Sequence, residues 1–259
     1  MNKKLVAVVL CGGIGSRMSQ LTKKKPKPLI TVHGKPIIWY VVSLLLFHNI
    51  KDIIFPLGYG GNKIEKFIKK NFRNKLNNFF FLKTGEKTEI KNRIKKSIKK
   101  LKLYENFIII NADTILNLNI KNFYKFHLKK RLLITLSGVK MRSSWGSIVL
   151  KKNNYSVEKF DVESKIEKYH IKGFKNYSAF RNTGVSIINC KCLNFINKTK
   201  KKDFEISLYN KYLKKNLVGA KVFEGIWYPI ETLKDLNAIK INKKLSQKIK
   251  LLKKKFNNF

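Results

Sequence analysis

Residues 5–10 form a continuous apolar run, Leu-Val-Ala-Val-Val-Leu, and a glycine-rich loop follows it directly at 11–17. A short run without polar alternation is typical of a strand that is buried on both faces, as in the middle of a parallel sheet. The glycines let the backbone come close to a ligand, and successive free N–H groups can form a concave anion site. The start of the chain therefore predicts a central strand of an α/β sheet with an anion site at its end.

Strand-like and helix-like segments alternate at short spacing through the first half of the chain. Further strands are expected at 53–57, 79–82 and 107–110, and helices at 36–48, 62–73 and 89–103. This alternation is typical of βαβ units, which build a mostly parallel sheet with helices on both faces.

The second half of the chain changes character. Strands are expected near 132–140, 146–150, 185–188 and 218–223, helices near 204–214 and 232–241, and an irregular polar stretch at 151–181. We read residues 1–242 as one α/β domain with a small α+β extension. Residues 243–259 are expected to form a Lys-rich C-terminal helix or tail, because Leu245, Ile249, Leu252 and Phe256 recur at helical spacing.

The charge of the chain is extreme: 57 Lys and Arg stand against 15 Asp and Glu, a formal net charge of +42. Almost all of the positive charge is lysine, spread along the whole chain. Lys, Asn, Ile and Phe have codons made mostly of A and T, so an AT-rich genome alone can account for the lysines. A nucleic-acid interface would favour Arg concentrated on one element. We therefore expect a solvated basic surface with no specific nucleic-acid partner, and keep a polyanion-binding surface as an alternative.

Several other classes are excluded by composition. The 44% hydrophobic content excludes wholesale disorder. No apolar run reaches the roughly 18–20 residues of a membrane span, and Cys11-Gly12-Gly13 ends the first run too early for a secretory signal. Three cysteines give no disulfide framework, which favours a cytoplasmic protein.

Two cations accompany the glycine-rich loop. Arg17 ends the segment Gly12-Gly13-Ile14-Gly15-Ser16-Arg17, and Lys27 lies between two prolines that stiffen its backbone, in Lys25-Pro26-Lys27-Pro28. The loop lacks the Gly-Lys-Ser/Thr of a P-loop and departs from the dinucleotide-binding pattern. The combination of strand, glycine-rich loop, Arg and Lys-Pro-Lys-Pro is much more specific than the loop alone.

With these motifs the chain resembles the sugar-1-phosphate nucleotidyltransferases, whose signature is an apolar strand, Leu-x-Gly-Gly-x-Gly-x-Arg and Lys-Pro-Lys-Pro. Further matching segments are 34–39, 58–59, 111–113, 145–147, 182–184 and 227–232. The short C-terminus, and Thr84-Gly85 followed by Thr88 and Arg93, are most similar to the glucose-1-phosphate cytidylyltransferase branch. Heptose-phosphate guanylyltransferases and short glucose-1-phosphate thymidylyltransferases are close alternatives. The resemblance implies a Rossmann-like, GT-A-like fold.

The resemblance also implies a reaction and a set of site residues. A sugar 1-phosphate oxygen would attack the α-phosphorus of an NTP, with Mg²⁺ as cofactor and pyrophosphate as leaving group. Catalysis is assigned to Arg17, Lys27 and Asp113, and the metal to Asp113 and Glu231. The nucleotide is assigned to Leu10, Cys11, Gly12, Gly13, Ile14, Gly15, Ser16, Arg17, Lys27, Thr88, Arg93 and Ala112, and the sugar phosphate to Gly146, Lys165, Asn182 and Gly184.

The chain departs from the family pattern at several of these positions. Ala112 replaces a glycine and is expected to add a methyl group beside the nucleotide, and Lys91-Asn92 replaces a loop whose backbone approaches the base. The Glu-Lys-Pro segment of the sugar site is blurred at 162–165, and Glu231 replaces the usual second metal-binding Asp. The base, the sugar, the oligomeric state and full activity are therefore left open by the sequence.

Other interpretations compete with an active enzyme. The same changes are compatible with a nucleotide- or sugar-phosphate-binding homologue that has lost turnover, and the lysines with a basic nucleic-acid-binding protein. Individual residues also have purely structural interpretations: Arg93 as part of a solvated helix face, Asp113 as a turn cap, and Gly184 as a turn or bulge glycine.

Overall fold

The computed structural model describes residues 3–23, 25–142, 147–150, 157–161, 165–166, 180–201 and 203–257. Gly146 and residues 162–164, which the sequence assigns to the sugar side, lie outside these residues. Lys165 lies in the two-residue strand β12 (Lys165–Ile166).

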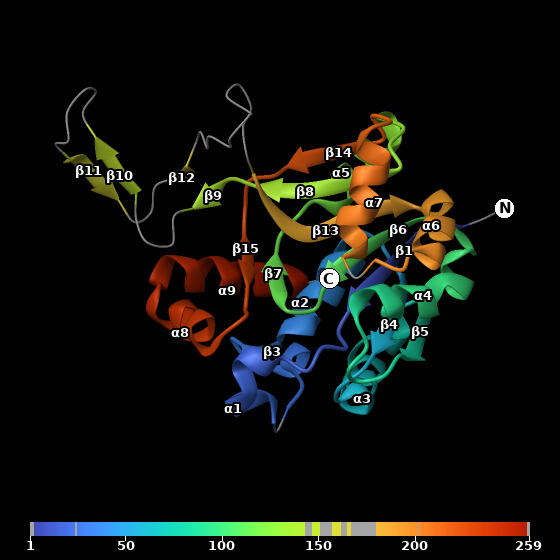
Figure 1. Cartoon of the computed structure of the whole chain (residues 1–259). Helices are drawn as coiled ribbons and strands as arrows, with labels where there is room; N and C mark the ends of the chain where they lie inside the picture. The colour runs from blue at the N-terminus through green and yellow to red at the C-terminus, as the bar shows by residue number, and fades with distance from the viewer. Residues whose placement is uncertain are drawn as a thin grey trace.

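A seven-stranded sheet forms the centre of the described part of the molecule, in the order β14-β8-β13-β6-β1-β4-β5 (Figure 1). Its strands are β1 (Lys3–Leu10), β4 (Asp52–Leu57), β5 (Asn78–Lys83), β6 (Tyr104–Asn111), β8 (Ile134–Val139), β13 (Arg181–Asn189) and β14 (Val218–Val222). Strand β13 pairs antiparallel with both of its neighbours, and the other pairings are parallel. The expected mixed, mostly parallel sheet is confirmed.

The apolar run of β1 supplies both faces of the sheet. Val6 and Val8 belong to one hydrophobic cluster, and Ala7 and Val9 belong to the other, with all four fully buried. This arrangement follows from the period of two along a strand, because successive side chains point to opposite faces. Helices therefore have to cover both faces, which explains why this strand shows no polar alternation.

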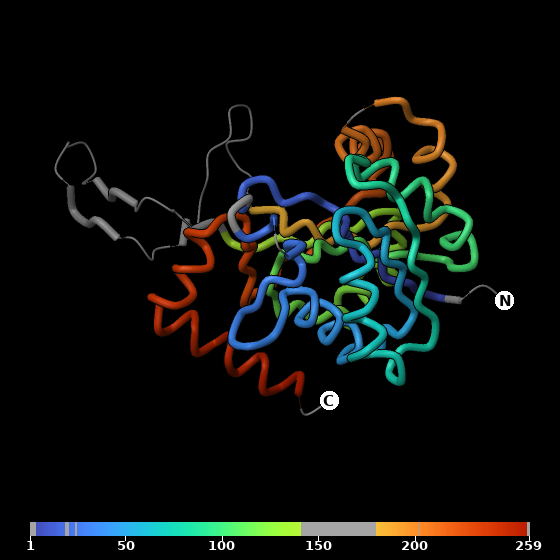
Figure 2. Tube along the Cα trace, turned by 90° about the horizontal axis from the view of Figure 1, so that it is seen from below, coloured from blue at the N-terminus to red at the C-terminus, as the bar shows by residue number. Residues whose placement is uncertain are grey.

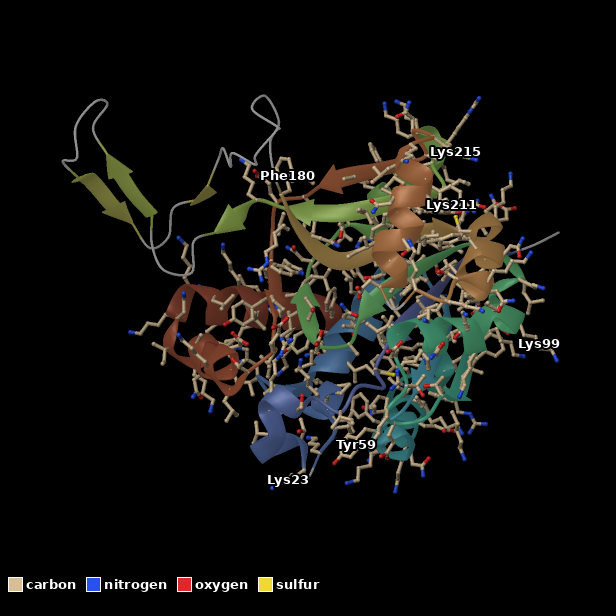
Figure 3. All side chains as sticks on the ribbon, viewed as in Figure 1. Lys23, Tyr59, Lys99, Phe180, Lys211 and Lys215 are labelled. Carbon is tan, nitrogen blue, oxygen red and sulfur yellow. The ribbon has the colours of Figure 1, made fainter. Side chains whose placement is uncertain are left out.

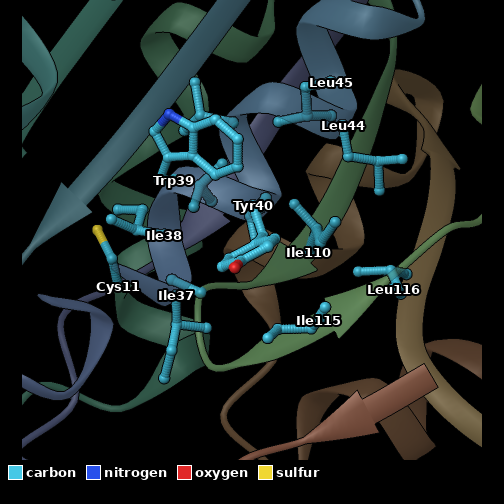
Figure 4. Packing of buried hydrophobic residues seen from close by; sticks show 14 of the residues in the cluster. Cys11, Ile37, Ile38, Trp39, Tyr40, Leu44, Leu45, Ile110, Ile115 and Leu116 are labelled. Atoms are coloured by element: carbon cyan, nitrogen blue, oxygen red, sulfur yellow. The ribbon is translucent and has the colours of Figure 1, made fainter. Parts of the chain in front are cut away.

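Different helices cover the two faces. The cluster of Ala7 and Val9 packs against α2 (Ile37–Phe47), α3 (Gly61–Phe72), α5 (Ile120–Lys129), α8 (Leu233–Ile241) and α9 (Lys243–Asn257). The cluster of Val6 and Val8 packs against α4 (Ile90–Leu101), α6 (Leu193–Lys198) and α7 (Phe204–Leu213). Helix α2 is buried nearly all round, and Figure 4 shows Trp39 and Tyr40 of this helix among Ile110 and Ile115.

The C-terminal helix packs into the main core. Its residues Ile249, Leu252 and Phe256 are buried at the spacing noted in the sequence. The ring of Phe256 lies 6.3 Å from that of Trp39 and 5.9 Å from that of Phe47, both in α2. Figure 2 shows the C-terminal helices running alongside the N-terminal part of the chain. The C-terminal segment is thus helical from Lys243 to Asn257.

The sequence missed some elements. Helices α5 and α6 were not expected, although Asn119 caps α5 by accepting a hydrogen bond from the Asn122 N–H. The polar stretch 151–181 was expected to be irregular, yet it contributes β11 (Val157–Asp161), which pairs with β10 (Ser147–Leu150), and β12, which pairs with β9 (Met141–Arg142). The remaining short elements are η1 (Ser16–Met18), α1 (Ser19–Thr22), η2 (Lys27–Leu29), β2 (Thr31–Val32), β3 (Lys35–Pro36), η3 (Arg73–Lys75), β7 (Thr114–Leu116), η4 (Cys190–Cys192) and β15 (Trp227–Pro229).

Candidate active site

The glycine-rich loop lies between the carboxyl end of β1 and the short helix η1. Gly15 has a positive φ of 70°, and a Cβ there would lie 3.1 Å from the Lys27 Cβ. The position of Gly13 is different, because a Cβ at Gly13 would have no atom within 4 Å. The loop therefore has a crowded side against the protein and an open side at Gly13, as an anion-binding backbone requires.

Lys27 reaches the end of the neighbouring strand β6. Its Nζ lies 2.7 Å from Oδ2 of Asp113, which is the second residue after the end of that strand. The Lys27 side chain is 13% exposed and that of Asp113 is 34% exposed, so this ion pair is shielded from solvent on several sides. The structure thus brings together two of the three residues to which catalysis was assigned.

Tyr59 is bonded to the residues just before the Lys-Pro-Lys-Pro segment and to the glycine-rich loop. Its hydroxyl donates to the carbonyl oxygens of Thr22 (2.9 Å) and Lys23 (3.3 Å), and its backbone N–H donates to the Gly12 carbonyl (3.2 Å). Figure 3 shows Tyr59 beside Lys23. Tyr59 belongs to the matched Gly58-Tyr59 segment but was not assigned to the site. It links the glycine-rich loop to the residues that lead into the Lys27 segment.

Glu231 is brought to the same place by a strand pairing. Strand β15 pairs antiparallel with β7, so that Pro229 faces Thr114, and the Ile230 N–H donates to the Asp113 carbonyl at 2.9 Å. The Glu231 Oε2 lies 2.6 Å from an Arg17 guanidinium nitrogen. The side chains of Arg17 and Glu231 are 71% and 49% exposed, so this second ion pair faces solvent.

The two carboxylates fit the metal that the sequence implies. Mg²⁺ prefers one or two carboxylates together with phosphate oxygens and water, which requires no cage of protein ligands. Asp113 and Glu231 supply that number of carboxylates from two chain segments whose backbones are hydrogen-bonded to each other. In the described part of the chain, this site included, no three His, Cys, Asp or Glu side chains gather in a metal-binding group.

Two departures from the family pattern, Ala112 and Lys91, have side chains directed away from the glycine-rich loop. The methyl group of Ala112 was expected beside the nucleotide, but Ala112 is 1% exposed and belongs to the main hydrophobic core. The side chain of Lys91 is directed to the segment before α7, where its Nζ donates to the carbonyls of Lys200 (3.3 Å) and Lys201 (3.1 Å). The adjacent Asn92 is exposed.

Arg93 lies beneath the glycine-rich loop. It is only 3% exposed, so its interpretation as part of a solvated helix face is wrong. Its guanidinium donates to the Gly12 carbonyl, and burial lowers its pKa. Burial also raises the pKa of the Cys11 thiol to about 12, which keeps this thiol neutral and unsuited to nucleophilic chemistry. The Thr88 hydroxyl donates to the Thr84 carbonyl at 2.5 Å.

Two of the four residues assigned to the sugar phosphate, Asn182 and Gly184, lie in the first half of β13. The Gly184 N–H donates to the Asn182 side-chain oxygen at 3.0 Å, and a Cβ on Gly184 would lie 2.7 Å from the Asn111 Nδ2. The Arg181 guanidinium stacks 5.0 Å above the ring of Trp227 in β15. Neither Asn111 nor Arg181 was assigned to the site, although Asn111 belongs to the matched segment 111–113.

A mostly parallel α/β sheet with a glycine-rich loop and two cation–carboxylate pairs at its edge defines a Rossmann-like nucleotidyltransferase. The chain belongs to the nucleotidyl transferase family, whose model matches residues 6–247. The resemblance drawn from the motifs is thereby confirmed.

Individual relatives extend over almost the whole chain. A probable glucose-1-phosphate cytidylyltransferase of Bacillus subtilis is 26% identical, covering 93% of this chain and 96% of the relative. A D-glycero-alpha-D-manno-heptose 1-phosphate guanylyltransferase of Campylobacter jejuni is 25% identical, covering 91% and 99%. A putative glucose-1-phosphate thymidylyltransferase from Bacillus anthracis, solved in complex with sucrose, shares the fold with a TM-score of 0.71 at 17% identity, covering 92% and 94%. No helix in the described residues is long and apolar enough to cross a membrane.

Proposed function

We propose that the protein transfers a nucleotidyl group from an NTP to a sugar 1-phosphate, giving an NDP-sugar and pyrophosphate. The observation that supports this most directly is a set of two ion pairs near the carboxyl ends of the central strands. Lys27 is paired with Asp113, and Arg17 is paired with Glu231. They gather two cations and two carboxylates beside a glycine-rich loop with an open side, which suits a triphosphate and its metal ion.

The attacking group needs little help from the protein. A phosphate monoester is already ionised near neutral pH, so no general base is required. The chain then has to hold the attacking oxygen and the α-phosphorus in line and to neutralise the charge of the triphosphate. Arg17 and Lys27 supply the positive charge, and the free N–H groups of the loop bind phosphate oxygens.

Asp113 and Glu231 would hold Mg²⁺ in this proposal. The metal, when bound, neutralises charge on the triphosphate. Asp113 is paired with Lys27, and Glu231 with Arg17, so binding of the nucleotide and its metal requires these four side chains to change partners. Asn182 and Gly184 are proposed to bind the sugar phosphate, with Gly146 and Lys165 as further contributors.

We propose CTP and glucose 1-phosphate as the first substrate pair to test. Thr84-Gly85, Thr88 and Arg93 resemble the cytidylyltransferase branch, and a probable cytidylyltransferase matches nearly the full chain. GTP with a heptose 1-phosphate and dTTP with glucose 1-phosphate are the next pairs, from the named relatives. We also propose that the protein works in the cytoplasm and that its NDP-sugar is used to make surface polysaccharide.

A matrix of the NTPs against a panel of sugar 1-phosphates, read by pyrophosphate release with and without Mg²⁺, tests the function. Metal-dependent release with one pair is the expected result. Binding of an NTP without release by any pair would instead identify a homologue that has lost turnover. DNA or RNA binding that weakens steeply with salt, in a protein without turnover, would favour the polyanion-binding alternative.

A further inference from the structure

We propose that Arg93 is a positioning residue that fixes the glycine-rich loop in its nucleotide-binding shape, and that it is not a ligand of the phosphates. The inference deepens the proposed function and rests on it. It starts from where the guanidinium lies: within the protein, at the carboxyl ends of three neighbouring strands.

These three strands are β1, β4 and β5, which are adjacent in the sheet. After β1, the Gly12 carbonyl accepts from the Arg93 Nη2 at 2.8 Å. After β5, the Glu86 carbonyl accepts from the same nitrogen at 3.1 Å, and the Thr84 hydroxyl accepts from Nη1. After β4, a Cβ on Gly58 would lie 2.6 Å from Nη1. One side chain from the first turn of α4 therefore connects the loops that follow the strands.

The Gly12 carbonyl is held by the Arg93 guanidinium at 2.8 Å and by the Tyr59 N–H at 3.2 Å, and its direction determines how the next peptide N–H points. In a trans peptide the C=O of one residue and the N–H of the next point in opposite directions. Because the Gly12 carbonyl is turned inward to Arg93, the N–H of Gly13 is turned outward. Gly13 is the position on the open side of the loop, where a Cβ would meet nothing within 4 Å. Arg93, together with the Tyr59 N–H, thus aims a donor at the space where a phosphate would bind.

The acceptors explain why an arginine is needed. All of its hydrogen-bond acceptors in the described part of the chain are neutral oxygens, and the residue is only 3% exposed. A buried charge has to be hydrogen-bonded, so displacing the Gly12 carbonyl would be costly. The planar fork of a guanidinium serves several acceptors at once, whereas the single ammonium of lysine cannot keep that geometry.

Space around the guanidinium supports the same role. A Cβ at Gly12 would collide with the Arg93 guanidinium, and Gly58 has equally little room. Both glycines are therefore required for Arg93 to reach the loop. An arginine that served only to bind phosphate would need no such enclosure. Its side chain would be directed to solvent, as that of Arg17 is, which is 71% exposed.

Three variants test the proposal: Arg93→Ala, Arg93→Lys and, as control, Arg73→Ala, which removes an exposed arginine from η3. The first readout is amide hydrogen exchange across residues 11–18, and the second is KM for the NTP and for the sugar 1-phosphate separately. We expect both Arg93 variants to exchange faster in the loop. We also expect kcat/KM for the NTP to fall on the order of 10²-fold, as for misplaced binding groups, with KM for the sugar 1-phosphate unchanged and Arg73→Ala like wild type.

Three outcomes would overturn the proposal. Arg93→Lys with near wild-type loop exchange and activity would show that only the charge matters. Arg93→Ala with unchanged loop exchange but lost activity would make Arg93 a direct ligand. If Arg93→Ala does not fold, Thr84→Val replaces the hydroxyl that accepts from Arg93 by a methyl group and keeps the shape of the side chain. Hydrogen exchange in the loop should then become faster, but less so than in the Arg93 variants. Unchanged exchange in Thr84→Val would also contradict the proposal. A wild-type protein that turns over no NTP would refute the proposed function, while loop exchange would still decide the role of Arg93.

Discussion

The ammonium of Lys27 lies 2.7 Å from Oδ2 of Asp113, although 86 residues separate them in the chain. Lys27 is held by a short proline-flanked helix, and Asp113 follows a central strand. A parallel sheet gathers the segments after its strands at one edge, which is where α/β folds bind their ligands. Each charge compensates the other, so that the two side chains are held together at the site.

Lys27→Ala is expected to lower the rate by on the order of 10²-fold or more, because it removes a preorganised charge partner. Pyrophosphate release under saturating substrates measures the effect. Lys25→Ala is the matched control, since Lys25 is an exposed lysine two residues earlier in the same segment. Near-native turnover of Lys27→Ala would show that this segment is not part of the active site.

Arg17→Ala is expected to lower the rate similarly, on the order of 10²-fold or more, while the free energy of unfolding changes little. The ion pair of Arg17 with Glu231 is largely exposed, and exposed pairs contribute about 0–1 kcal/mol. Activity and urea-induced unfolding should therefore separate in this variant. A parallel loss of both would instead give Arg17 a structural role.

The central sheet could be predicted from the sequence because its strands are continuous apolar runs between helices. Helix α5 could not, since lysines and Asn dilute its periodicity, and the buried His127 takes one of its inward positions. The place of β13 depends on long-range pairing, which local patterns do not encode. It pairs with β6 and β8, both earlier in the chain and not consecutive strands.

The candidate site was predictable where a short segment carries its residues. Arg17 and Lys27 flank one loop, and Asp113 ends one strand. The pairing of Arg17 with Glu231 was not predictable, because it depends on β15 lying against β7. The burial of Arg93 was equally hidden: in a helix rich in lysine it looks like a surface residue, and only the space left by glycines in other loops shows otherwise.

His127 predicts a pH dependence of stability. It is 1% exposed, its ring nitrogens contact Thr135 (2.8 Å) and Asn106 (3.1 Å), and burial lowers its pKa from 6.5 to about 4. The unfolded chain therefore binds a proton on His127 at a higher pH than the folded protein does. The resulting stability is fully present above about pH 6.5 and is lost as the pH falls towards about 4, by at most about 3 kcal/mol.

Urea unfolding of wild type and His127→Gln between pH 7.5 and 4.5 measures this effect. The variant should be less stable at pH 7.5 and should lose less stability on acidification, because its side chain does not titrate. The difference between the two proteins removes the contribution of other titrating groups. Identical pH slopes in both proteins would rule out His127 as the source.

The lysines of α9 are expected to matter little for catalysis. Replacing Lys248, Lys250, Lys253, Lys254 and Lys255 by Gln should leave the rate within a few-fold, because exposed charges beyond about 8 Å are screened at physiological salt. Lys253 also donates to the His33 carbonyl at 2.7 Å, so a modest loss of stability is expected. Loss of activity in the lysine variant that persists at high salt would assign the tail a specific role.

Phe256→Ala is the contrast to the lysine variant. It empties a buried position and should cost about 3–5 kcal/mol of stability.

Glu231 tests whether the second carboxylate serves the metal. Glu is one methylene longer than the Asp of the family pattern, and Mg²⁺ tolerates little deviation from oxygen distances of about 2.0–2.1 Å. The side chain has room for this adjustment, because it is half exposed and its backbone is held by the Ile230 contact to Asp113 and by the Asp235 carboxylate, which accepts from the Glu231 N–H at 2.9 Å. We therefore expect Asp113→Ala to abolish metal-dependent activity and Glu231→Asp to retain much of it. Glu231→Gln should need a higher Mg²⁺ concentration for half-maximal rate, and an unchanged Mg²⁺ titration in that variant would remove Glu231 from the metal site.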